Sequence, residues 1–296
     1  MKRLKGLFFA IASSATFGLI PLLALPVLNT GMSTSSVLSY RFILSAIIMG
    51  LITFFKGKFE KISSKEIFTI IILGFFYAAT ALLLLVAYTK IPSGIATTIH
   101  FLYPLMVALI MIFFFKESTS SSIIAAIGLS LIGVSVLSWS KAGEIEPMGI
   151  VFALSSIFTY ALYIVGLQKS NIKHLNEYAL TFYILFSSSI FFLINALLDG
   201  GIEMIPDTSA GINLFLLALL PTVISDLTLI LAVKYIGPTI TSILGCMEPL
   251  TAVAIGVVVF KEPFGFSNAF GICSILIAVA LVVLKTRKEE AVSQVL

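Results

Sequence analysis

Two apolar stretches align with each other without a gap: residues 87–117, AYTKIPSGIATTIHFLYPLMVALIMIFFFKE, and residues 232–262, AVKYIGPTITSILGCMEPLTAVAIGVVVFKE. At a constant offset of 145 residues, Ile91 falls on Ile236, Pro104 falls on Pro249, and the same Phe-Lys-Glu triplet ends both stretches. Each stretch is long enough to form a membrane-spanning helix with a proline near its middle. The match indicates that the chain is a duplicated unit.

The composition is that of an integral membrane protein. Hydrophobic residues make up 59% of the chain, charged residues only 11%, and the mean hydropathy is +1.14, whereas an ordinary soluble domain carries about 25% charged residues. The apolar runs are continuous and lack the alternation of barrel strands, so an all-α fold is predicted. The net charge of +4 reports on membrane topology, and no nucleic-acid partner is expected.

The sequence lacks the motifs of several function classes. There is no G-x-x-x-x-G-K-[ST] loop, so nucleotide hydrolysis by a P-loop is not expected. Neither G-x-S-x-G nor H-E-x-x-H occurs, which argues against the usual serine and zinc active sites. Two histidines and two dispersed cysteines suggest neither a metal centre nor a disulfide framework. We therefore predict no catalytic residues, no metal site and no cofactor.

Ten transmembrane helices are predicted from the apolar runs. Their approximate ranges are 6–28, 35–55, 66–89, 93–115, 121–139, 148–168, 177–198, 211–233, 237–260 and 264–284. Most of the 18 lysines and arginines fall in terminal segments and loops on one side of these spans. The positive-inside rule makes that side cytoplasmic, so both termini are predicted to be cytoplasmic.

The duplication extends over the whole chain. Gly6 and Ser13 match Gly149 and Ser156 at an offset of 143, so the predicted units are residues 1–143 and residues 144–296, the second with a short cytoplasmic tail. Each unit contains five spans, and copies with an odd number of spans enter the membrane from opposite sides. The predicted architecture is a pair of inverted five-helix repeats.

The end of each unit carries residues that resemble a known family. They are Tyr88-Thr-Lys-Ile-Pro-Ser-Gly with Tyr103-Pro104, and Tyr235-Ile-Gly-Pro with Met247-Glu248-Pro249-Leu250, each followed by a Lys-Glu pair. Together with Tyr40-Arg41-Phe42 in the second span, they resemble the EamA family of the drug/metabolite transporter superfamily. The resemblance implies a carrier in the inner membrane of a bacterium or archaeon that exports amino acids or other small metabolites. It also implies a central cavity lined mainly by the third, fourth, eighth and ninth helices; Tyr103 departs from the small polar residue common before the family's proline.

The two prolines of the repeated stretch indicate where a site would lie. A proline inside a helix leaves the carbonyl four residues earlier without its donor, and in a membrane such a carbonyl is tolerated only beside protein or water. Pro104 and Pro249 are therefore predicted as hinges beside a cavity, and a kink that only shapes packing is the alternative. The carbonyls concerned belong to His100 and Gly245. On the same helix faces lie the polar residues Thr97, His100, Tyr103, Ser242 and Glu248.

Glu248 and Asp226 are predicted to lie at a similar depth near the bilayer centre. A charge there costs at least about 2.5 kcal/mol and faces the protein interior or water. We therefore expect both carboxylates in one cavity, with protons as the candidate coupling ion. Hydrogen bonding between helices is the structural alternative for Glu248, and uniport is the alternative to proton coupling.

Several further residues have two interpretations each. His100 is expected to bind a substrate carboxylate or relay a proton, or else to be a packing residue. Arg41 is expected either to snorkel toward the outer membrane surface, or to attract an anionic substrate group or pair with an acid. Tyr77, Tyr88 and Tyr160 are expected to line the cavity, although tyrosines near span ends are commonly interfacial anchors.

The sequence predicts a secondary carrier of small metabolites that works by alternating access. Its expected partners are a small-molecule substrate and the lipid bilayer, and it is expected to act as a monomer or homodimer. The predicted substrate-binding residues are His100, Tyr103, Thr97, Glu248, Ser242, Asp226, Tyr77 and Arg41. The alternative is an integral membrane enzyme that acts on a lipid or lipid-linked substrate with Asp226, Glu248 and His100 as acid and base; a membrane sensor without transport is a third.

Overall fold

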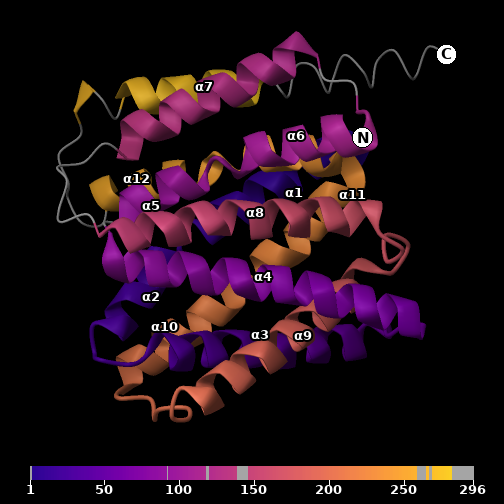
Figure 1. The fold of residues 1–296 in the computed structure, drawn as a ribbon, viewed down its shortest axis with the longest axis vertical. Coiled ribbons are helices and arrows are strands. Elements are labelled where there is room, and N and C mark those ends of the chain that lie inside the picture. The colour runs from indigo at the N-terminus through magenta and orange to yellow at the C-terminus, as the bar shows by residue number, and fades with distance from the viewer. Residues whose placement is uncertain are drawn as a thin grey trace.

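The computed structural model describes residues 2–91, 93–117, 120–138, 146–258, 265–266 and 269–281, and all regular secondary structure in these ranges is helical (Figure 1). The elements are α1 (Lys2–Phe17), α2 (Ile20–Leu28), α3 (Thr34–Phe55), α4 (Ser64–Lys90), α5 (Ser93–His100), α6 (Tyr103–Phe115), α7 (Ser121–Ser138), α8 (Pro147–Lys169), α9 (Glu177–Leu198), α10 (Thr208–Ala218), the π-helix η1 (Leu219–Ile224), α11 (Ser225–Leu244) and α12 (Met247–Val258). A further apolar helix covers Ala269–Leu281.

Six helical stretches are long and apolar enough to cross a membrane. They are Lys2–Leu28, Thr34–Phe55, Ser64–Lys90, Pro147–Lys169, Glu177–Leu198 and Thr208–Leu244. Shorter apolar helices occur at Tyr103–Phe115, Ser121–Val136 and Ala269–Leu281. These elements confirm an all-helical membrane protein in the described ranges. The second Lys-Glu pair, at 261–262, and the basic tail lie outside the described residues.

The bundle is apolar outside and holds hydroxyl groups inside. Large side chains such as Phe55, Phe114 and Leu198 are exposed, whereas Ser45 is fully buried. The Ser45 hydroxyl donates to the carbonyl of Ala218 (3.0 Å) on another helix. A lipid-facing apolar surface with hydroxyl groups between closely packed helices is the arrangement that a bilayer favours.

The predicted fourth and ninth spans are each broken just before their proline. α5 ends at His100 and α6 begins at Tyr103, while α11 ends at Leu244 and α12 begins at Met247. The expectation that each proline lies inside one continuous, kinked helix is therefore wrong. Each proline instead lies in the first turn of a new helix, where a residue without an N–H is well tolerated.

One of the two carbonyls that we expected to be free is bonded. The Gly245 carbonyl accepts a hydrogen bond from the backbone N–H of Glu248 (2.9 Å). Because the helix is broken here, this N–H bonds to the carbonyl three residues earlier and replaces the donor that Pro249 lacks. The Gly245 carbonyl is therefore not the free ligand group that the sequence suggested.

The chain turns back at Gly237, within the element α11. Gly237 has φ 80° and ψ 166°, a conformation that residues with a Cβ rarely adopt. The chain then returns across the bundle toward α12 (Figure 1), and α1 packs against both α11 and α12. Asp226 precedes Gly237 by eleven residues and Glu248 follows it by eleven. At about 1.5 Å per residue, both carboxylates lie about 16 Å from this turn, so they lie at a similar depth.

Equivalent residues of the duplicated sequence make equivalent close contacts. A methyl group added at Gly6 of α1 would lie 2.6 Å from Cγ2 of Ile236, and one added at Gly149 of α8 would lie 2.7 Å from Cγ2 of Ile91. Glycine is needed at both positions because the neighbouring helix approaches so closely. α1 thus packs along α11 as α8 packs along α4.

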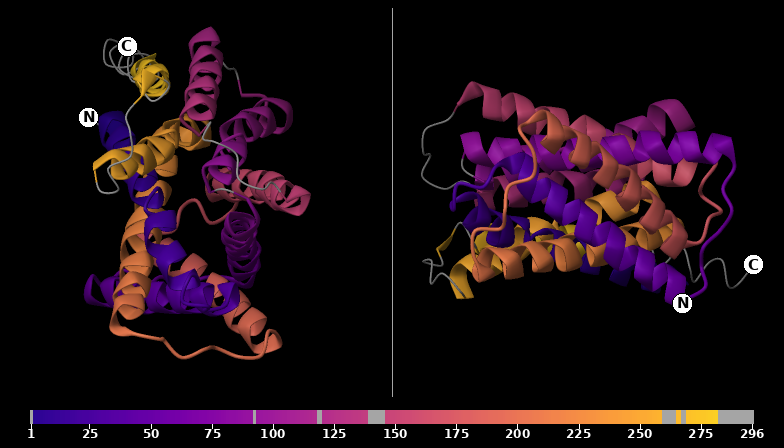
Figure 2. Two further views of the ribbon diagram at one scale, coloured as in Figure 1. Left: turned by 90° about the vertical axis from the view of Figure 1, so that its left-hand side faces the viewer. Right: turned by 90° about the horizontal axis from the view of Figure 1, so that it is seen from below.

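Two pairs of helices mark the ends of the long axis of the molecule. α3 and α9 pack together at one end, and α7 and the helix Ala269–Leu281 lie side by side at the other (Figures 1 and 2). At this second end, Gly133 of α7 lies against Gly271 and Ile275. Helices α1, α4, α8 and α11 occupy the middle of the bundle, and the polar cluster described next lies among them.

Candidate functional site

Asp226 lies at the start of α11, directly after the π-helix η1. It is 1% exposed. Its Oδ1 accepts a hydrogen bond from the hydroxyl of Tyr163 on α8 (2.5 Å). Its Oδ2 is buried and has no hydrogen-bond partner in the described part of the chain. Because π-helical turns are frequent at functional sites, this carboxylate is the first candidate group.

Arg41 of α3 is held by η1. Its Nε donates to the hydroxyl of Thr222 (2.7 Å), and its Nη2 donates to the carbonyl of Pro221 (3.5 Å). Pro221 has no N–H for the carbonyl of Leu217, and the Thr222 hydroxyl supplies the missing donor (2.8 Å). The proline thus produces the irregular turn that accepts the guanidinium.

The position of Arg41 overturns one of its two interpretations. The side chain is only 2% exposed and lies within electrostatic range of Asp226 and Tyr77. Its guanidinium also lies 5.2 Å from the ring centroid of Phe42. Snorkelling to the membrane surface is therefore wrong, because the charged end points into the bundle and is held there by hydrogen bonds.

Tyrosines connect the two buried carboxylates. The rings of Tyr77 and Tyr163 are stacked with centroids 4.9 Å apart, Tyr160 lies 6.3 Å from Tyr163, and Tyr103 lies 4.7 Å from Tyr160. The chain of rings begins beside Asp226 and ends near Glu248, which acts electrostatically on Tyr103 and Tyr160. The predicted lining residues Tyr77 and Tyr103 are therefore brought together by α8, which inserts between them.

Glu248 is almost fully buried, with 5% exposure. Beyond Tyr103 and Tyr160, it acts electrostatically on Tyr88 of α4. Its backbone packs against the break between α1 and α2, because a methyl group added at Gly18 would lie 2.5 Å from the Glu248 carbonyl oxygen. No side chain in the described ranges donates a hydrogen bond to its carboxylate.

His100 lies in the same cluster, 5.3 Å from both Tyr103 and Tyr160 between ring centroids. Its Nδ1 lies 2.7 Å from the hydroxyl of Ser156, and that hydroxyl donates to the carbonyl of Ala153 (2.6 Å). Since the serine has only one hydrogen to give, Nδ1 must be the donor to it. Nε2 is then an acceptor, and it is buried without a partner in the described ranges.

Two predicted residues have weaker connections to the cluster. The Thr97 hydroxyl lies 3.1 Å from that of Tyr88. Thr97 is therefore hydrogen-bonded to a tyrosine that lies within the electrostatic range of Glu248. The Ser242 hydroxyl donates to the carbonyl of Thr239 on its own helix (2.9 Å). Ser242 is therefore satisfied locally, and in the described ranges no side-chain hydrogen bond joins it to the other candidates.

Several members of the cluster were not among the predicted binding residues. Tyr163 and Ser156 lie on α8, and Thr222 lies on η1. Ser156, Tyr160 and Tyr163 follow one another at intervals of four and three residues, the spacing of one helix face. That stripe was visible in the sequence; the proximity of Thr222 to Arg41 was not, because it depends on the π-helical turn.

The cavity inside the cluster is small. It is lined by Arg41, Tyr77 and Tyr88 among others, and its volume is about 10 Å³, roughly the space of one water molecule. In this conformation the part of the site beside Arg41 is closed. A metabolite would enter only after the surrounding helices move apart.

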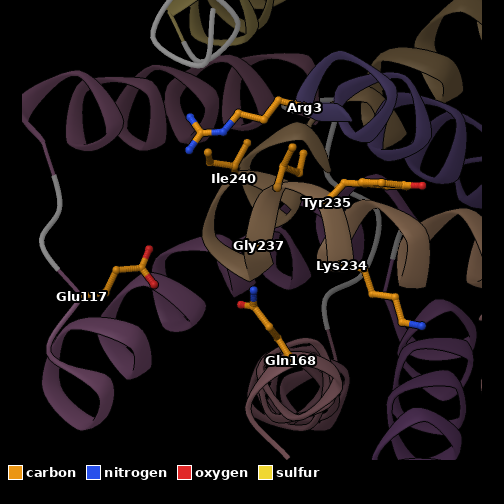
Figure 3. A pocket seen from close by; sticks show the side chains of 8 residues that line it. Arg3, Glu117, Gln168, Lys234, Tyr235, Gly237 and Ile240 are labelled. Carbon is orange, nitrogen blue, oxygen red and sulfur yellow. The ribbon is translucent and has the colours of Figure 1, made fainter. Parts of the chain in front are cut away.

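A larger pocket of about 270 Å³ lies at the turn of Gly237 (Figure 3). Gln168 points at Gly237, and the wall also includes Arg3 and Glu117. The Thr239 hydroxyl donates to Glu117 (3.2 Å) across this region, so α11 is tied to the end of α6. The pocket joins α1, α6, α8 and α11 about 16 Å from the two carboxylates.

Comparison with known proteins gives a consistent result. A model of the EamA-like transporter family matches the chain twice, over residues 4–139 and 147–284. An uncharacterized transporter of Synechocystis sp. is 26% identical over 216 residues, which cover 70% of this chain and 64% of that protein. The uncharacterized transporter YetK of Bacillus subtilis is 22% identical over 294 residues, covering 95% and 86%. One crystal structure superimposes with a TM-score of 0.81 at 15% identity, covering 96% of this chain and 98% of the other, and shows the same fold.

Proposed function

Because this chain belongs to the EamA-like transporter family, we propose that it is a secondary carrier that exports small metabolites, such as amino acids, across the inner membrane of a prokaryote. The observation that carries this proposal is the buried polar cluster of Arg41, Asp226 and Glu248 inside a bundle with an apolar surface. Ionisable groups at that depth are characteristic of substrate and ion pathways.

The carrier is built from two inverted repeats, residues 1–143 and residues 144–296. The matched contacts of Gly6 with Ile236 and of Gly149 with Ile91 support this division, as does the double match to the family model. Five spans in each repeat bring the number to ten and leave both termini in the cytoplasm. The pocket at Gly237 then faces the cytoplasm, and α1, α4, α8 and α11 enclose the site at the repeat interface.

The helix breaks support alternating access as the mechanism. Pro104 and Pro249 start the second halves of two broken spans, so α6 and α12 can tilt relative to α5 and α11 with little loss of hydrogen bonding. Such tilting would open the cluster toward the pocket at Gly237 on one side and close it on the other. Protons are the candidate coupling ion, with Asp226 and Glu248 as the groups that carry them.

Counterflow into sealed vesicles tests the carrier proposal. Purified protein is reconstituted with one unlabelled metabolite inside, and a labelled copy of the same metabolite is added outside. A carrier accumulates the label transiently and leaves the solute chemically unchanged. A membrane enzyme that acts on a lipid-linked substrate would instead release a modified product, which mass spectrometry detects, and that result would replace the proposal.

Proton coupling is tested in the same vesicles with an imposed pH gradient. The gradient should drive uptake or release by the wild type, whereas any residual transport by Glu248→Gln should not respond to it. An equal response in the variant would remove Glu248 from the coupling step and leave uniport, or Asp226 alone, as the explanation.

A further inference from the structure

The three charged side chains that are buried in the described bundle do not balance one another. They are Arg41, Asp226 and Glu248. Arg41 and Asp226 act on each other electrostatically, so one positive charge offsets one negative charge. Arg41 has no comparable effect on Glu248. With all three groups ionised, the cluster carries one uncompensated negative charge, and it is located on Glu248.

The surroundings of Glu248 do not supply its missing partner. In the described ranges its carboxylate receives no hydrogen bond and takes part in no ion pair. An unpaired charge in a low-dielectric interior is strongly unfavourable. A proton neutralises such a carboxylate, and a bound cation satisfies it in the ionised form; in the described ranges no cationic side chain forms an ion pair with it.

The walls around Glu248 are suited to a cation as well. Tyr88, Tyr103 and Tyr160 lie within its electrostatic range. The rings of Tyr103 and Tyr160 meet edge to face at 76°, and Tyr160 stacks on Phe17 with centroids 6.1 Å apart. The faces of such rings attract ammonium groups, and aromatic walls with a carboxylate are a known mode of recognising them.

Three helix breaks meet beside Glu248 and would allow the space around its carboxylate to open. They are the breaks between α1 and α2, between α5 and α6, and between α11 and α12. Gly18, in the first break, packs directly on the Glu248 backbone, and Gly245, in the third, packs on the Tyr103 hydroxyl. Small shifts at these three positions would enlarge the space around Glu248 while the rest of the bundle stays packed.

Building on the proposed function, we infer that the carrier recognises its substrate through a cationic nitrogen, either a protonated amine or a quaternary ammonium, which pairs with Glu248 between the rings of Tyr88, Tyr103 and Tyr160. An anionic group is repelled at this position. A neutral group of the same shape leaves the carboxylate unpaired and binds more weakly.

Matched ligand pairs test this inference on the purified wild-type protein. Choline is compared with its neutral isostere 3,3-dimethylbutan-1-ol, and phenethylamine is compared with 2-phenylethanol, by thermal unfolding in detergent. The cation of at least one pair should raise the melting temperature by several degrees, because a ligand that binds the folded state stabilises it. The neutral isosteres should leave the melting temperature within one degree of the unliganded protein.

Variants then locate the interaction. Glu248→Gln should lose the shift caused by the cation, whereas the matched substitution Glu146→Gln, at an exposed residue that pairs with Lys90, should keep it. Tyr160→Phe retains a ring and should hold affinity close to that of the wild type. Tyr160→Leu removes the ring and should lower affinity about tenfold.

The outcomes separate the two proposals. If neither cation stabilises the wild type more than its isostere, or if Glu248→Gln keeps the difference, the cation site is wrong; counterflow of any solute would still support the carrier. If cations bind but no solute shows counterflow, the proposed function fails and the binding site stands. Should Glu248→Gln not fold, the ligand pairs on the wild type decide alone.

Discussion

At the scale of single residues, the hydroxyl of Tyr163 is the only side-chain hydrogen-bond donor to Asp226 in the described ranges. Arg41 acts on the same carboxylate electrostatically. Tyr163→Phe keeps the ring and removes that donor. We expect it to lower the free energy of unfolding by about 1–3 kcal/mol, because both carboxylate oxygens then lie buried without a hydrogen bond. Thermal unfolding in detergent measures the change.

The control for this substitution is Tyr235→Phe. Tyr235 is 38% exposed and stacks on Phe9, so loss of its hydroxyl should change the melting temperature by less than about one degree. Tyr163→Phe combined with Asp226→Asn should be less destabilised than the sum of the single changes, since the two residues share one interaction. Strict additivity would show that the short contact has no energetic significance.

Arg41 gives a second test at this scale, based on charge. Arg41→Gln removes the positive charge that acts electrostatically on the buried Asp226 carboxylate. Because no direct ion pair joins the two residues in the described ranges, the loss should be smaller than the cost of about 3–5 kcal/mol typical of breaking a direct buried pair. Adding Asp226→Asn removes the stranded charge and should recover much of the stability. The melting temperatures of the two single variants and the double variant show whether this occurs; a double variant less stable than Arg41→Gln would contradict the electrostatic interaction.

At the scale of helices, the break between α11 and α12 is shaped by close packing. A methyl group added at Gly245 would collide with the hydroxyl of Tyr103. Gly245→Ala should therefore destabilise the protein by about 1–3 kcal/mol, the usual range for overpacking. Tyr103→Phe removes the colliding oxygen and should restore part of the loss in the double variant. Chemical unfolding measures both, and no rescue would mean that the break itself, rather than the contact, needs glycine.

The turn at Gly237 depends on backbone conformation instead. Its φ of 80° is unfavourable for a residue with a Cβ, so Gly237→Ala should destabilise the fold by about 1–2 kcal/mol. Gly128→Ala is the matched control, because Gly128 lies in helix α7 with open space around it. There, alanine should be neutral or slightly stabilising, since it is the better helix former. Equal effects at the two positions would contradict the proposed strain.

At the scale of the whole molecule, membrane orientation is open to direct measurement. The proposed topology places the loop after α2 outside the cell and the loop after α3 in the cytoplasm. Asn29→Cys should react with a membrane-impermeant maleimide on intact cells, and Lys58→Cys should react only after the cells are opened. The wild-type chain, in which Cys246 is buried and Cys273 is exposed, measures the background. The reverse labelling pattern would invert the assignment.

Much of this whole-molecule organisation was readable from the sequence, and the reasons are physical. The apolar runs and the repeat around Pro104 and Pro249 follow from the needs of a bilayer, so the all-helical class and the two matched halves were predictable. The helix breaks before those prolines were missed because helix periodicity continues across Phe101–Leu102 and Gly245–Cys246. The sequence did not decide between the two interpretations of Arg41 because its partner, Thr222, lies in a π-helical turn that no pattern of residues predicts.

The unequal number of buried charges has an electrical consequence. If the empty carrier reorients with Arg41, Asp226 and Glu248 all ionised, the moving centre is a net anion, and a potential of 100 mV biases that return step by up to about 2.3 kcal/mol. Once loaded with a monocation, the same centre is neutral and is indifferent to voltage. The resting potential of the cell would therefore act on the return of the unoccupied protein, and so set its turnover, without acting on the step that carries cargo.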